Sequence, residues 1–284
     1  IFMRKCDICI SLTGYVYAPR IAQKKGAIII MERGSKHILE QKKILEKNPH
    51  KKNEAIPNRN IKCNLKAYQF ANFISVASQH VKESFLLHQY PENRIFVNPY
   101  GVDLSMFKPL PNIPKKYDVI MVGGWGYEKG CDLIVEAIRK TNYSFIHVGS
   151  IKDVDFPQEK NFTHIDPVDQ SKLIEYYNQA KVFILPSRQD GFGMVLSQAL
   201  ACNLPIIGSN NCGAPDLKKM VELPEYITII KDYTADAIVT AIHTAIKNYE
   251  QLGERIYAGN AIENLTWEAY GKRYANFLHK IIKQ

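Results

Sequence analysis

The chain has 284 residues, 46% of them hydrophobic and 23% charged, a composition that excludes a disordered protein and supplies enough apolar material for two packed cores. No apolar run approaches the roughly 18 residues that a membrane-spanning helix needs, and no secretory signal is visible, so we expect a cytoplasmic location. The formal net charge of +9 arises in the N-terminal part, because residues 1–112 hold 18 basic and 8 acidic residues whereas residues 113–284 hold 19 and 20.

The first part of the chain alternates short β-branched runs with helical stretches. Helices are predicted over "APRIAQKKG", which ends at Gly26, and over "HVKESFLLHQ". Strands are predicted at residues 7–12, 27–31, 73–78 and 94–99. The chain starts at Ile1, and an initiator methionine is not normally removed before so bulky a residue. We therefore expect natural sequence to precede it.

Cys6 and Cys9 form a C-x-x-C pair at the start of the first predicted strand. Such a pair is typical of zinc or redox chemistry, but a zinc site needs two more ligands and the sequence holds no second pair. We favour reduced cysteines in a cytoplasmic protein, and we expect no metal site.

Much of the basic excess lies in residues 36–66, which contain nine basic and three acidic residues. Within it, "HILEQKKILEK" predicts a short helix with an apolar face and a basic face. Two interpretations remain open. The apolar face packs on its own domain and the basic face is solvated, or the helix lies on an anionic membrane surface. The segment lacks interleaved aromatic residues, so we expect no nucleic-acid partner.

The second part of the chain continues the alternation of strands and helices. Strands are predicted at residues 117–123, 144–149, 181–186, 205–209 and 226–230. This order implies parallel sheets with helices on both faces, and three prolines within residues 107–116 suit a connector between domains. We predict an α/β protein of two Rossmann-like, doubly wound domains that face a cleft. The predicted units are a partial N-terminal domain at 1–112, a C-terminal domain at 113–266 and a final helix at 267–284 that packs back toward the N-terminal domain.

Three loops of the second domain carry glycines between the end of a strand and the start of a helix. Residues 190–193 read "DGFG", Gly213 enters the helix after the next strand, and Gly124 lies in a loop with the cation Lys129. The first amides of a helix have no internal partner and carry partial positive charge, and glycine lets a phosphate approach them. Because parallel strands end at one edge of a sheet, these loops together predict a cradle for a nucleotide diphosphate.

Two other nucleotide-binding patterns do not fit. The glycines at 124, 126 and 130 give G-x-G-x-x-x-G, one residue longer than the dinucleotide fingerprint, and the next strand ends without an acid. This disfavours nicotinamide binding. The sequence also lacks G-x-x-x-x-G-K-[ST], which excludes a Walker-type nucleotidase.

Taken together, four segments resemble retaining glycosyltransferases of family 4, which have the two-domain GT-B architecture. The segments are "SVASQHVKESFL", "FVNPYGVDLSMFKP", "VGGWGYEKGCDLIVEAI" and "VFILPSRQDGFGMVLSQALACNLPII". They stand in the family's order and cover most of residues 70–282. The resemblance therefore implies a GT-B fold whose first domain lacks its start.

The resemblance also implies roles for individual residues. The family's acid–x7–Glu pair falls on Asp190, which would contact the donor sugar, and on Gln198, which would bind the ribose hydroxyls without a charge. Lys129 matches the lysine that neutralises the leaving phosphates. The family's usual arginine in the same loop is Gly124 here, so one cation is missing, and Arg188 is a candidate substitute. The donor-binding residues implied are Gly124, Gly191, Phe192, Gly193, Gln198 and Gly213.

The N-terminal domain departs most from the family. Its glycine-rich loop near the acceptor is absent from the sequence. A histidine often lies near the donor sugar in the family, and after the second predicted strand this chain offers Arg33 or His37. We take His37 as a third catalytic candidate beside Asp190 and Lys129, with an ordinary surface or helix-start histidine as the alternative.

The function implied is transfer of a sugar from a UDP- or GDP-linked donor to a hydroxyl of a glycan or lipid-linked acceptor, with retention of configuration and no metal or other cofactor. Peripheral binding to the inner face of the membrane through residues 36–66 would suit a lipid-linked acceptor. The alternatives are a non-catalytic subunit that binds nucleotide sugars through a degenerate site, and a phosphorylase or epimerase of the same architecture.

Overall fold

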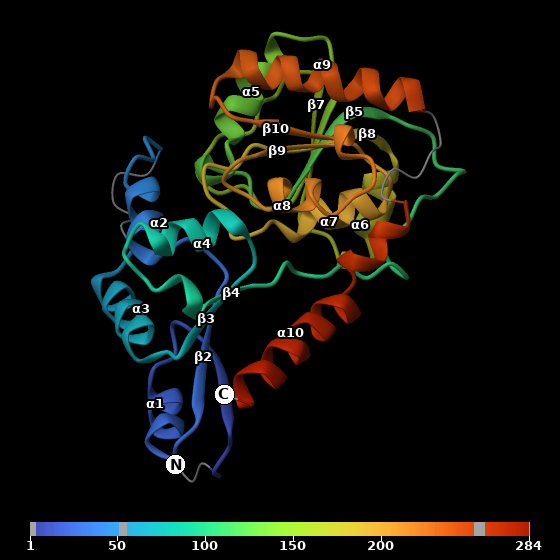
Figure 1. Cartoon of the computed structure of the whole chain (residues 1–284). Coiled ribbons are helices and arrows are strands. Elements are labelled where there is room, and N and C mark those ends of the chain that lie inside the picture. The colour runs from blue at the N-terminus through green and yellow to red at the C-terminus, as the bar shows by residue number, and fades with distance from the viewer. Residues whose placement is uncertain (1–3, 51–55, 253–258, 284) are drawn as a thin grey trace.

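The structure is a computed structural model that describes residues 4–50, 56–252 and 259–283. Residues 51–55 of the basic segment lie outside the described residues. The described part forms two α/β units, each built on a parallel sheet, with the C-terminal helix running from the second unit back along the first (Figure 1). The predicted fold class is confirmed.

The N-terminal sheet has four parallel strands in the order β1-β2-β3-β4. The strands are β1 Ile8–Leu12, β2 Ile28–Arg33, β3 Phe73–Val76 and β4 Ile95–Val97. The helices of this unit are α1 Tyr17–Lys24, α2 Ile38–Leu45, α3 Asn58–Phe70 and α4 Gln79–Leu86, followed by the 3-10 turn η1 Glu92–Arg94. β-branched residues such as Ile29 and Ile74 are fully buried in its core, where they pack with Phe85 of α4.

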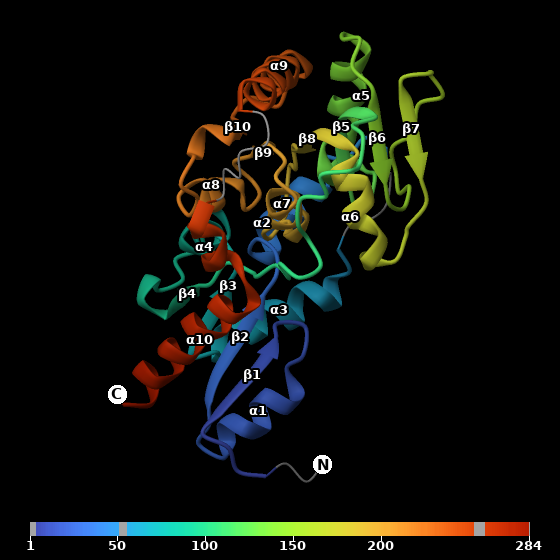
Figure 2. The ribbon, with the colours of Figure 1, turned by 90° about the vertical axis from the view of Figure 1, so that its right-hand side faces the viewer.

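The C-terminal sheet has six parallel strands in the order β10-β9-β8-β5-β6-β7. The strands are β5 Tyr117–Val122, β6 Phe145–Val148, β7 Phe162–Ile165, β8 Ala180–Leu185, β9 Ile206–Ser209 and β10 Ile227–Ile230. The helices are α5 Cys131–Arg139, α6 Gln170–Asn178, α7 Met194–Ala201, α8 Ala214–Lys218, α9 Ala235–Leu252 and α10 Trp267–Ile282, with 3-10 turns η2 Tyr127–Lys129, η3 Pro224–Tyr226 and η4 Gly259–Leu265. Helices α5 and α9 cover one face, and α6, α7 and α8 cover the other (Figures 1 and 2).

The strand order places two loops side by side. Strand β5 pairs with β6 on one side and with β8 on the other. The chain adds β6 and β7 outward from β5 on one side, and then adds β8, β9 and β10 outward on the other side. In open parallel sheets, ligands bind beyond the carboxyl ends of the strands at such a switch point. The loops that follow β5 and β8 are the ones that carry Lys129 and Asp190.

Helix α10 starts at the second unit and packs on the sheet of the first unit. Its aromatic face packs on the N-terminal sheet, where Phe277 stacks on Phe96 at a ring-centroid distance of 4.1 Å. At its start, the amide of Val102 donates to the carbonyl oxygen of Leu265 over 2.7 Å, and the Arg273 guanidinium donates to Asn98 Oδ1 over 2.8 Å. The chain thus crosses between the units twice at one place.

The sequence did not predict strand β7 or helices α3 and α9. Strand β7 reads "FTHI" at the sheet edge, and only Phe162 of the strand is buried. Thr163 and His164 interrupt the continuous apolar run that is typical of a central strand. In the ranges that the structure describes, no helix combines the length and apolar character needed to cross a membrane.

The predicted helix of the basic segment is α2. Ile38 is buried in the N-terminal core, and Leu39 packs against the same core. The structure therefore shows this end of the apolar face packed on its own domain, as the first of the two interpretations predicts.

Candidate active site

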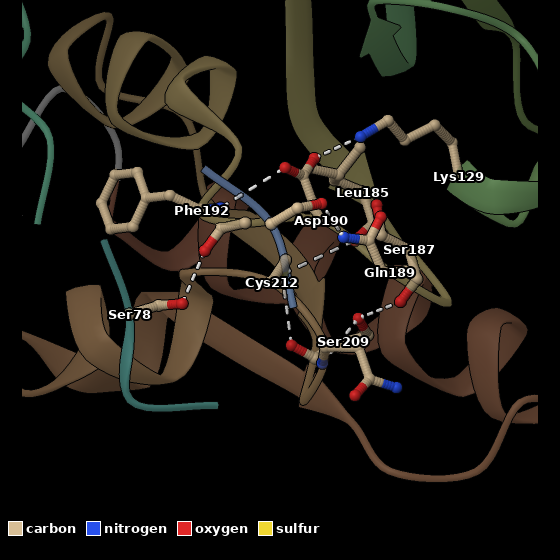
Figure 3. Close-up of polar contacts among 12 residues, drawn as sticks. Ser78, Lys129, Leu185, Ser187, Gln189, Asp190, Phe192, Ser209 and Cys212 are labelled. Atoms are coloured by element: carbon tan, nitrogen blue, oxygen red, sulfur yellow. Dashed lines mark hydrogen bonds and ion pairs between the residues drawn. The ribbon is translucent and has the colours of Figure 1, made fainter. Parts of the chain in front are cut away.

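Lys129 and Asp190 meet at the switch point of the C-terminal sheet. The Lys129 ammonium donates a short hydrogen bond to Asp190 Oδ2, and both side chains are about four-fifths buried, with 21% and 17% of their surface exposed (Figure 3). Burial lowers the pKa of Lys129, but the charge and hydrogen bond of Asp190 outweigh it and hold that pKa above its ordinary value. The ammonium therefore stays charged in a poorly solvated place, where its field on a nearby phosphate is strong.

The loop after β8 needs glycine at two positions. Gly193 precedes the first residue of α7 with φ +79°, a left-handed conformation that side chains rarely adopt. A Cβ on Gly191 would collide with the carbonyl oxygen of Gly34, which belongs to the N-terminal unit. The loop thus opens the amino end of α7 toward the cleft and lets the two units touch closely.

The neighbouring loops hold this loop in place. The Gly213 amide donates to the Phe192 carbonyl oxygen over 2.6 Å, and the Phe192 ring is buried against Gly213. Ser209 Oγ donates to the Ser187 carbonyl oxygen over 2.6 Å (Figure 3). Phe192 and Gly213 thus lie beside Asp190 as structural supports, and the donor-binding roles given to them from the sequence stay predictions.

The N-terminal unit reaches the same loop through helix α4. Ser78 Oγ donates to the Gly191 carbonyl oxygen over 2.5 Å (Figure 3), and His80 Nε2 lies 2.7 Å from the Asp190 carbonyl oxygen. Burial lowers the pKa of His80 to about 4, so the neutral ring donates this hydrogen bond at neutral pH. The sequence analysis included Ser78 and His80 in a family segment but did not assign them a role.

His37 lies elsewhere. Its backbone amide donates to Ser84 Oγ over 2.8 Å, and its buried ring stacks on His88 at 4.0 Å between Tyr68 and Phe85. Burial lowers the pKa of His37 to about 3. The structure does not bring this ring to Asp190 or Lys129, and its catalytic role stays a prediction. The histidine that does contact the Asp190 loop is His80.

A second cation lies beside Lys129, and the sequence analysis missed it. A pocket of about 160 Å³ between the units has Leu45 and Asn48 on one side, and its other side is lined by two lysines, two acids and two glycines: Lys129, Lys152, Glu128, Asp153, Gly124 and Gly126. A Cβ on Gly124 would lie 2.8 Å from the Lys152 ammonium and would collide with its Cε. The absence of a side chain at 124 therefore makes room for Lys152, which comes from the loop after β6. No sequence motif marks this lysine, and only the pairing of β5 with β6 reveals it.

Arg188, the candidate replacement for the missing cation, is engaged elsewhere. Its guanidinium makes two hydrogen bonds to the Asp132 carboxylate, of 2.6 and 2.7 Å, and its central carbon lies 3.8 Å from the centre of the Tyr127 ring. This bidentate and stacked arrangement fixes the residue in the wall of the loop. Of the two candidates, Lys152 lines the pocket with Lys129.

Gln198 lies in α7 with 9% of its surface exposed. Its Oε1 accepts a 2.9 Å hydrogen bond from the hydroxyl of the fully buried Tyr177. The oxygen is therefore already in use in the structure, and ribose binding by this residue stays a prediction.

The described residues contain no cluster of three or more His, Cys, Asp or Glu side chains that could hold a metal ion. Asp153 and Asp155 do have D-x-D spacing, but Asp153 already accepts hydrogen bonds of 2.9 Å from the Tyr127 amide and 2.8 Å from Asn48. All six cysteines are free, including Cys6 and Cys9. The expectation that neither metal nor cofactor is needed stays a prediction.

Comparison with known proteins places this geometry in context. The family model described as glycosyl transferases group 1 matches residues 105–261, which contain every predicted donor-binding residue and both Lys129 and Asp190. A probable sucrose-phosphate synthase of Thermosipho melanesiensis is 26% identical in an alignment of 242 positions that covers 75% of this chain and 56% of that protein. A GDP-mannose-dependent phosphatidylinositol monomannoside mannosyltransferase of Mycolicibacterium smegmatis is 23% identical over 73% of this chain and 62% of that protein. The chain spans less than two thirds of either relative.

Solved structures share the fold. Sucrose-phosphate synthase from Thermosynechococcus elongatus superposes with a TM-score of 0.69 at 18% identity, covering 93% of this chain and 70% of that one. Anabaena HepE in complex with UDP superposes with a TM-score of 0.70 at 15% identity, covering 93% of this chain and 75% of that one. At these identities the likeness shows the two-sheet GT-B architecture and nothing finer.

Proposed function

The chain belongs to the glycosyl transferases group 1 family, and on that premise we propose that it transfers a sugar from a nucleotide diphosphate sugar to an acceptor hydroxyl with retention of anomeric configuration. One observation carries the proposal. Lys129 and Asp190 meet at the mouth of α7, at the switch point of the sheet. The mannosyltransferase named above is GDP-mannose-dependent, and HepE has been solved with UDP and with UDP-glucose.

The proposed chemistry is electrostatic. As the bond from the anomeric carbon to the diphosphate breaks, negative charge grows on the phosphates. The first amides of α7, the Lys129 ammonium and Lys152 face that charge and stabilise it. Asp190 contacts the donor sugar, whose ring carbon becomes oxocarbenium-like. The acceptor hydroxyl attacks from the face that the diphosphate leaves, which retains the configuration.

The acceptor side belongs to the N-terminal unit. We propose a glycan or lipid-linked acceptor, with residues 36–66 near an anionic membrane surface. Vesicles of phosphatidylglycerol and phosphatidylcholine should bind the protein in a salt-sensitive way, and Lys42→Gln with Lys43→Gln should weaken that binding. Vesicle binding that does not respond to the double variant would exclude a membrane role for α2.

The direct test is turnover by the full chain. Nucleotide release and sugar transfer are measured with UDP-glucose, UDP-N-acetylglucosamine and GDP-mannose, each with and without glycan and lipid-linked acceptors. We expect one donor to be consumed and its sugar to appear on an acceptor with the anomeric configuration of the donor. Nucleotide binding without turnover would instead favour a non-catalytic subunit. The hydrogen-bonded oxygen of Gln198 and the missing side chain at Gly124 are consistent with that alternative. A changed sugar nucleotide in the absence of any acceptor would favour an epimerase.

A further inference from the structure

Arg33 is a partly buried cation at the carboxyl end of β2 whose hydrogen-bond partners are all neutral. Its guanidinium donates to the Lys36 carbonyl oxygen over 3.0 Å, to Asn64 Oδ1 over 3.2 Å and to Gln41 Oε1 over 2.6 Å. Among the described residues, no carboxylate pairs with it. Burial lowers its pKa, in keeping with a charge that the protein has not balanced. A guanidinium that is partly withdrawn from water and paired only with neutral acceptors can take an anion as its counter-charge, so the arrangement points to an anion site.

The guanidinium lines a pocket that can hold such an anion. The pocket has a volume of about 560 Å³ and lies between the loop after β1, the start of α2 and helix α3. Arg59 lines the same pocket, together with the amide side chains of Gln41, Asn60 and Asn64, and no described lining residue is acidic. Arginine, which presents five N–H groups, uses three of them in the hydrogen bonds above, so two remain for a ligand.

Helix α3 extends the positive charge. Arg59, Lys62 and Lys66 recur at helical spacing, and all three line a second pocket of about 350 Å³ that shares Arg59 and Cys63 with the first. The combined charge exceeds what one carboxylate would balance and suits a phosphate, which guanidinium groups bind in a forked geometry.

This pocket is connected to the donor site through the three residues that follow Arg33. Gly34 lies against Gly191, Ser35 Oγ accepts a 2.5 Å hydrogen bond from Gln189 Nε2, and the Lys36 ammonium donates to Asn211 Oδ1 over 2.6 Å. Helix α2 borders the Arg33 pocket with Gln41 and the Lys129 pocket with Leu45. A molecule held by Arg33 therefore lies on the N-terminal side of the same cleft.

We propose that the pocket of Arg33 and Arg59 binds a phosphate group on the acceptor, away from the hydroxyl that receives the sugar. This inference rests on the proposed function, because it names the class of acceptor as a phosphate-bearing molecule. The phosphate belongs to a soluble sugar or polyol phosphate or to a lipid headgroup, and both present the same oxyanion to the two guanidinium groups.

The test measures binding of inorganic phosphate to the full chain by equilibrium dialysis. A Lys129→Met background removes one donor-side cation and weakens phosphate binding there, so the effect of the Arg33 and Arg59 variants is read against a smaller donor-side contribution. We expect Arg33→Gln to weaken this binding at least tenfold and Arg59→Gln to weaken it several-fold. Arg20→Gln, on α1 of the same unit and outside the pocket, should leave it unchanged. Because Arg33 makes three hydrogen bonds within its unit, thermal unfolding is measured for each variant. If Arg33→Gln does not fold, the exposed Arg59 provides the test through Arg59→Gln.

Two further arms separate the sources of the phosphate. Glucose 6-phosphate serves as the soluble probe, and vesicles of phosphatidic acid with phosphatidylcholine serve as the lipid probe against phosphatidylcholine alone. Arg33- and Arg59-dependent binding of either probe supports the proposal and identifies the source. Phosphate affinity that stays within twofold of the parent in both arginine variants, or that falls equally in Arg20→Gln, overturns it.

UDP and GDP binding distinguish this inference from the function on which it rests. In the chain with Lys129 intact, we expect Arg33→Gln to bind nucleotide as the parent does. Nucleotide binding without phosphate binding would exclude the proposed acceptor phosphate site and leave the proposed transferase function in place. Phosphate binding that depends on Arg33, without any nucleotide binding, would instead exclude the proposed transferase function while supporting an anion-binding site at Arg33.

Discussion

At the scale of single residues, the central feature of the site is the charged ammonium of Lys129. Lys129 keeps its charge because Asp190 pairs with it in a place where water screens little. Strands β5 and β8, which lead into the loops of Lys129 and Asp190, carry a second pair at their opposite ends, where the Lys181 ammonium lies 2.8 Å from Asp118 Oδ1. One pair faces the cleft and the other does not, which provides a control within one sheet.

We predict that Lys129→Met lowers kcat/KM by a factor of about 10² to 10³, the range seen when one group that stabilises transition-state charge is removed. Lys181→Met, which breaks the pair at the far edge, should change kcat/KM by less than about twofold. Steady-state kinetics and thermal unfolding of both variants check this. Equal losses in the two variants would mean that Lys129 acts on the fold and not on the donor.

Lys152 gives a second prediction at this scale. Its side chain is exposed and lines the pocket beside Lys129, so under the proposed function we expect Lys152→Met to weaken UDP binding by about 1 kcal/mol, or about fivefold. The effect should shrink as salt is raised. Lys160→Met removes an exposed lysine outside that pocket and should have no effect in the same titration calorimetry. An unchanged UDP affinity in Lys152→Met would show that the cation missing at Gly124 has no replacement.

Buried histidines predict how stability depends on pH. The folded pKa of His80 is about 4, below its ordinary value of 6.5, because burial disfavours the charged ring. Between pH 6.5 and 4 the unfolded chain takes up a proton that the folded chain does not, so the free energy of unfolding falls as the pH is lowered through that window. The share of one such histidine is on the order of 3 kcal/mol.

We expect His80→Gln to flatten the pH dependence between pH 6.5 and 4 and the exposed His279→Gln to leave it unchanged. Denaturant unfolding at a series of pH values measures both. A slope in His80→Gln equal to that of the parent would contradict the burial of a neutral His80 ring.

At the scale of elements, the entrance to α7 sets the geometry of the site. Gly193 has φ +79°, and a Cβ there would lie 2.8 Å from Leu185 Cδ2. We predict that Gly193→Ala lowers the free energy of unfolding by about 1–2 kcal/mol and weakens nucleotide binding, because the strained turn reorients the first amides of the helix. Gly271→Ala, where a Cβ meets open space within α10, should stabilise the protein by up to about 1 kcal/mol. Nucleotide affinity unchanged in Gly193→Ala would contradict a role for the α7 amides.

Central strands could be predicted from the sequence because they are continuous apolar runs, as in "KVFILP" and "AIIIM". The three glycine loops could be predicted because strand, glycine and helix follow each other along the chain. The contact of Lys129 with Asp190 could not, because it depends on β5 lying next to β8, and 61 residues separate the two side chains in sequence. Lys152 and His80 were missed for the same reason, since each reaches the site from a segment whose neighbours only the sheet order and the packing of α4 determine.

At the scale of the whole molecule, the two units meet at the loop after β8, which carries Asp190. Ser78 and His80 of α4 bind the backbone of residues 190–191, and Asn48 donates to Asp153 over 2.8 Å. The Lys129 pocket between the units has a volume of about 160 Å³, below the roughly 300–1,000 Å³ typical of ligand sites. We therefore expect the units to part when a complete nucleotide sugar binds, with the bend at the double crossing near Val102 and Leu265.

The two-unit architecture was predictable from the alternation of strands and helices, and it is confirmed. The closeness of the units was not, because Gly191 against Gly34 and Lys36 against Asn211 join positions far apart in the sequence. The phosphate pocket of Arg33 and Arg59 arises in the same way, from α3 folding over the end of β2.

A crystal structure of the chain with UDP or GDP bound tests the central claim most directly. The account predicts that the diphosphate lies at the amino end of α7, within hydrogen-bond distance of the Lys129 ammonium and the amides of Gly191 to Met194, with Lys152 on its outer side. A nucleotide found at another place on the chain, or no binding of either nucleotide in titration of the same protein, would contradict it.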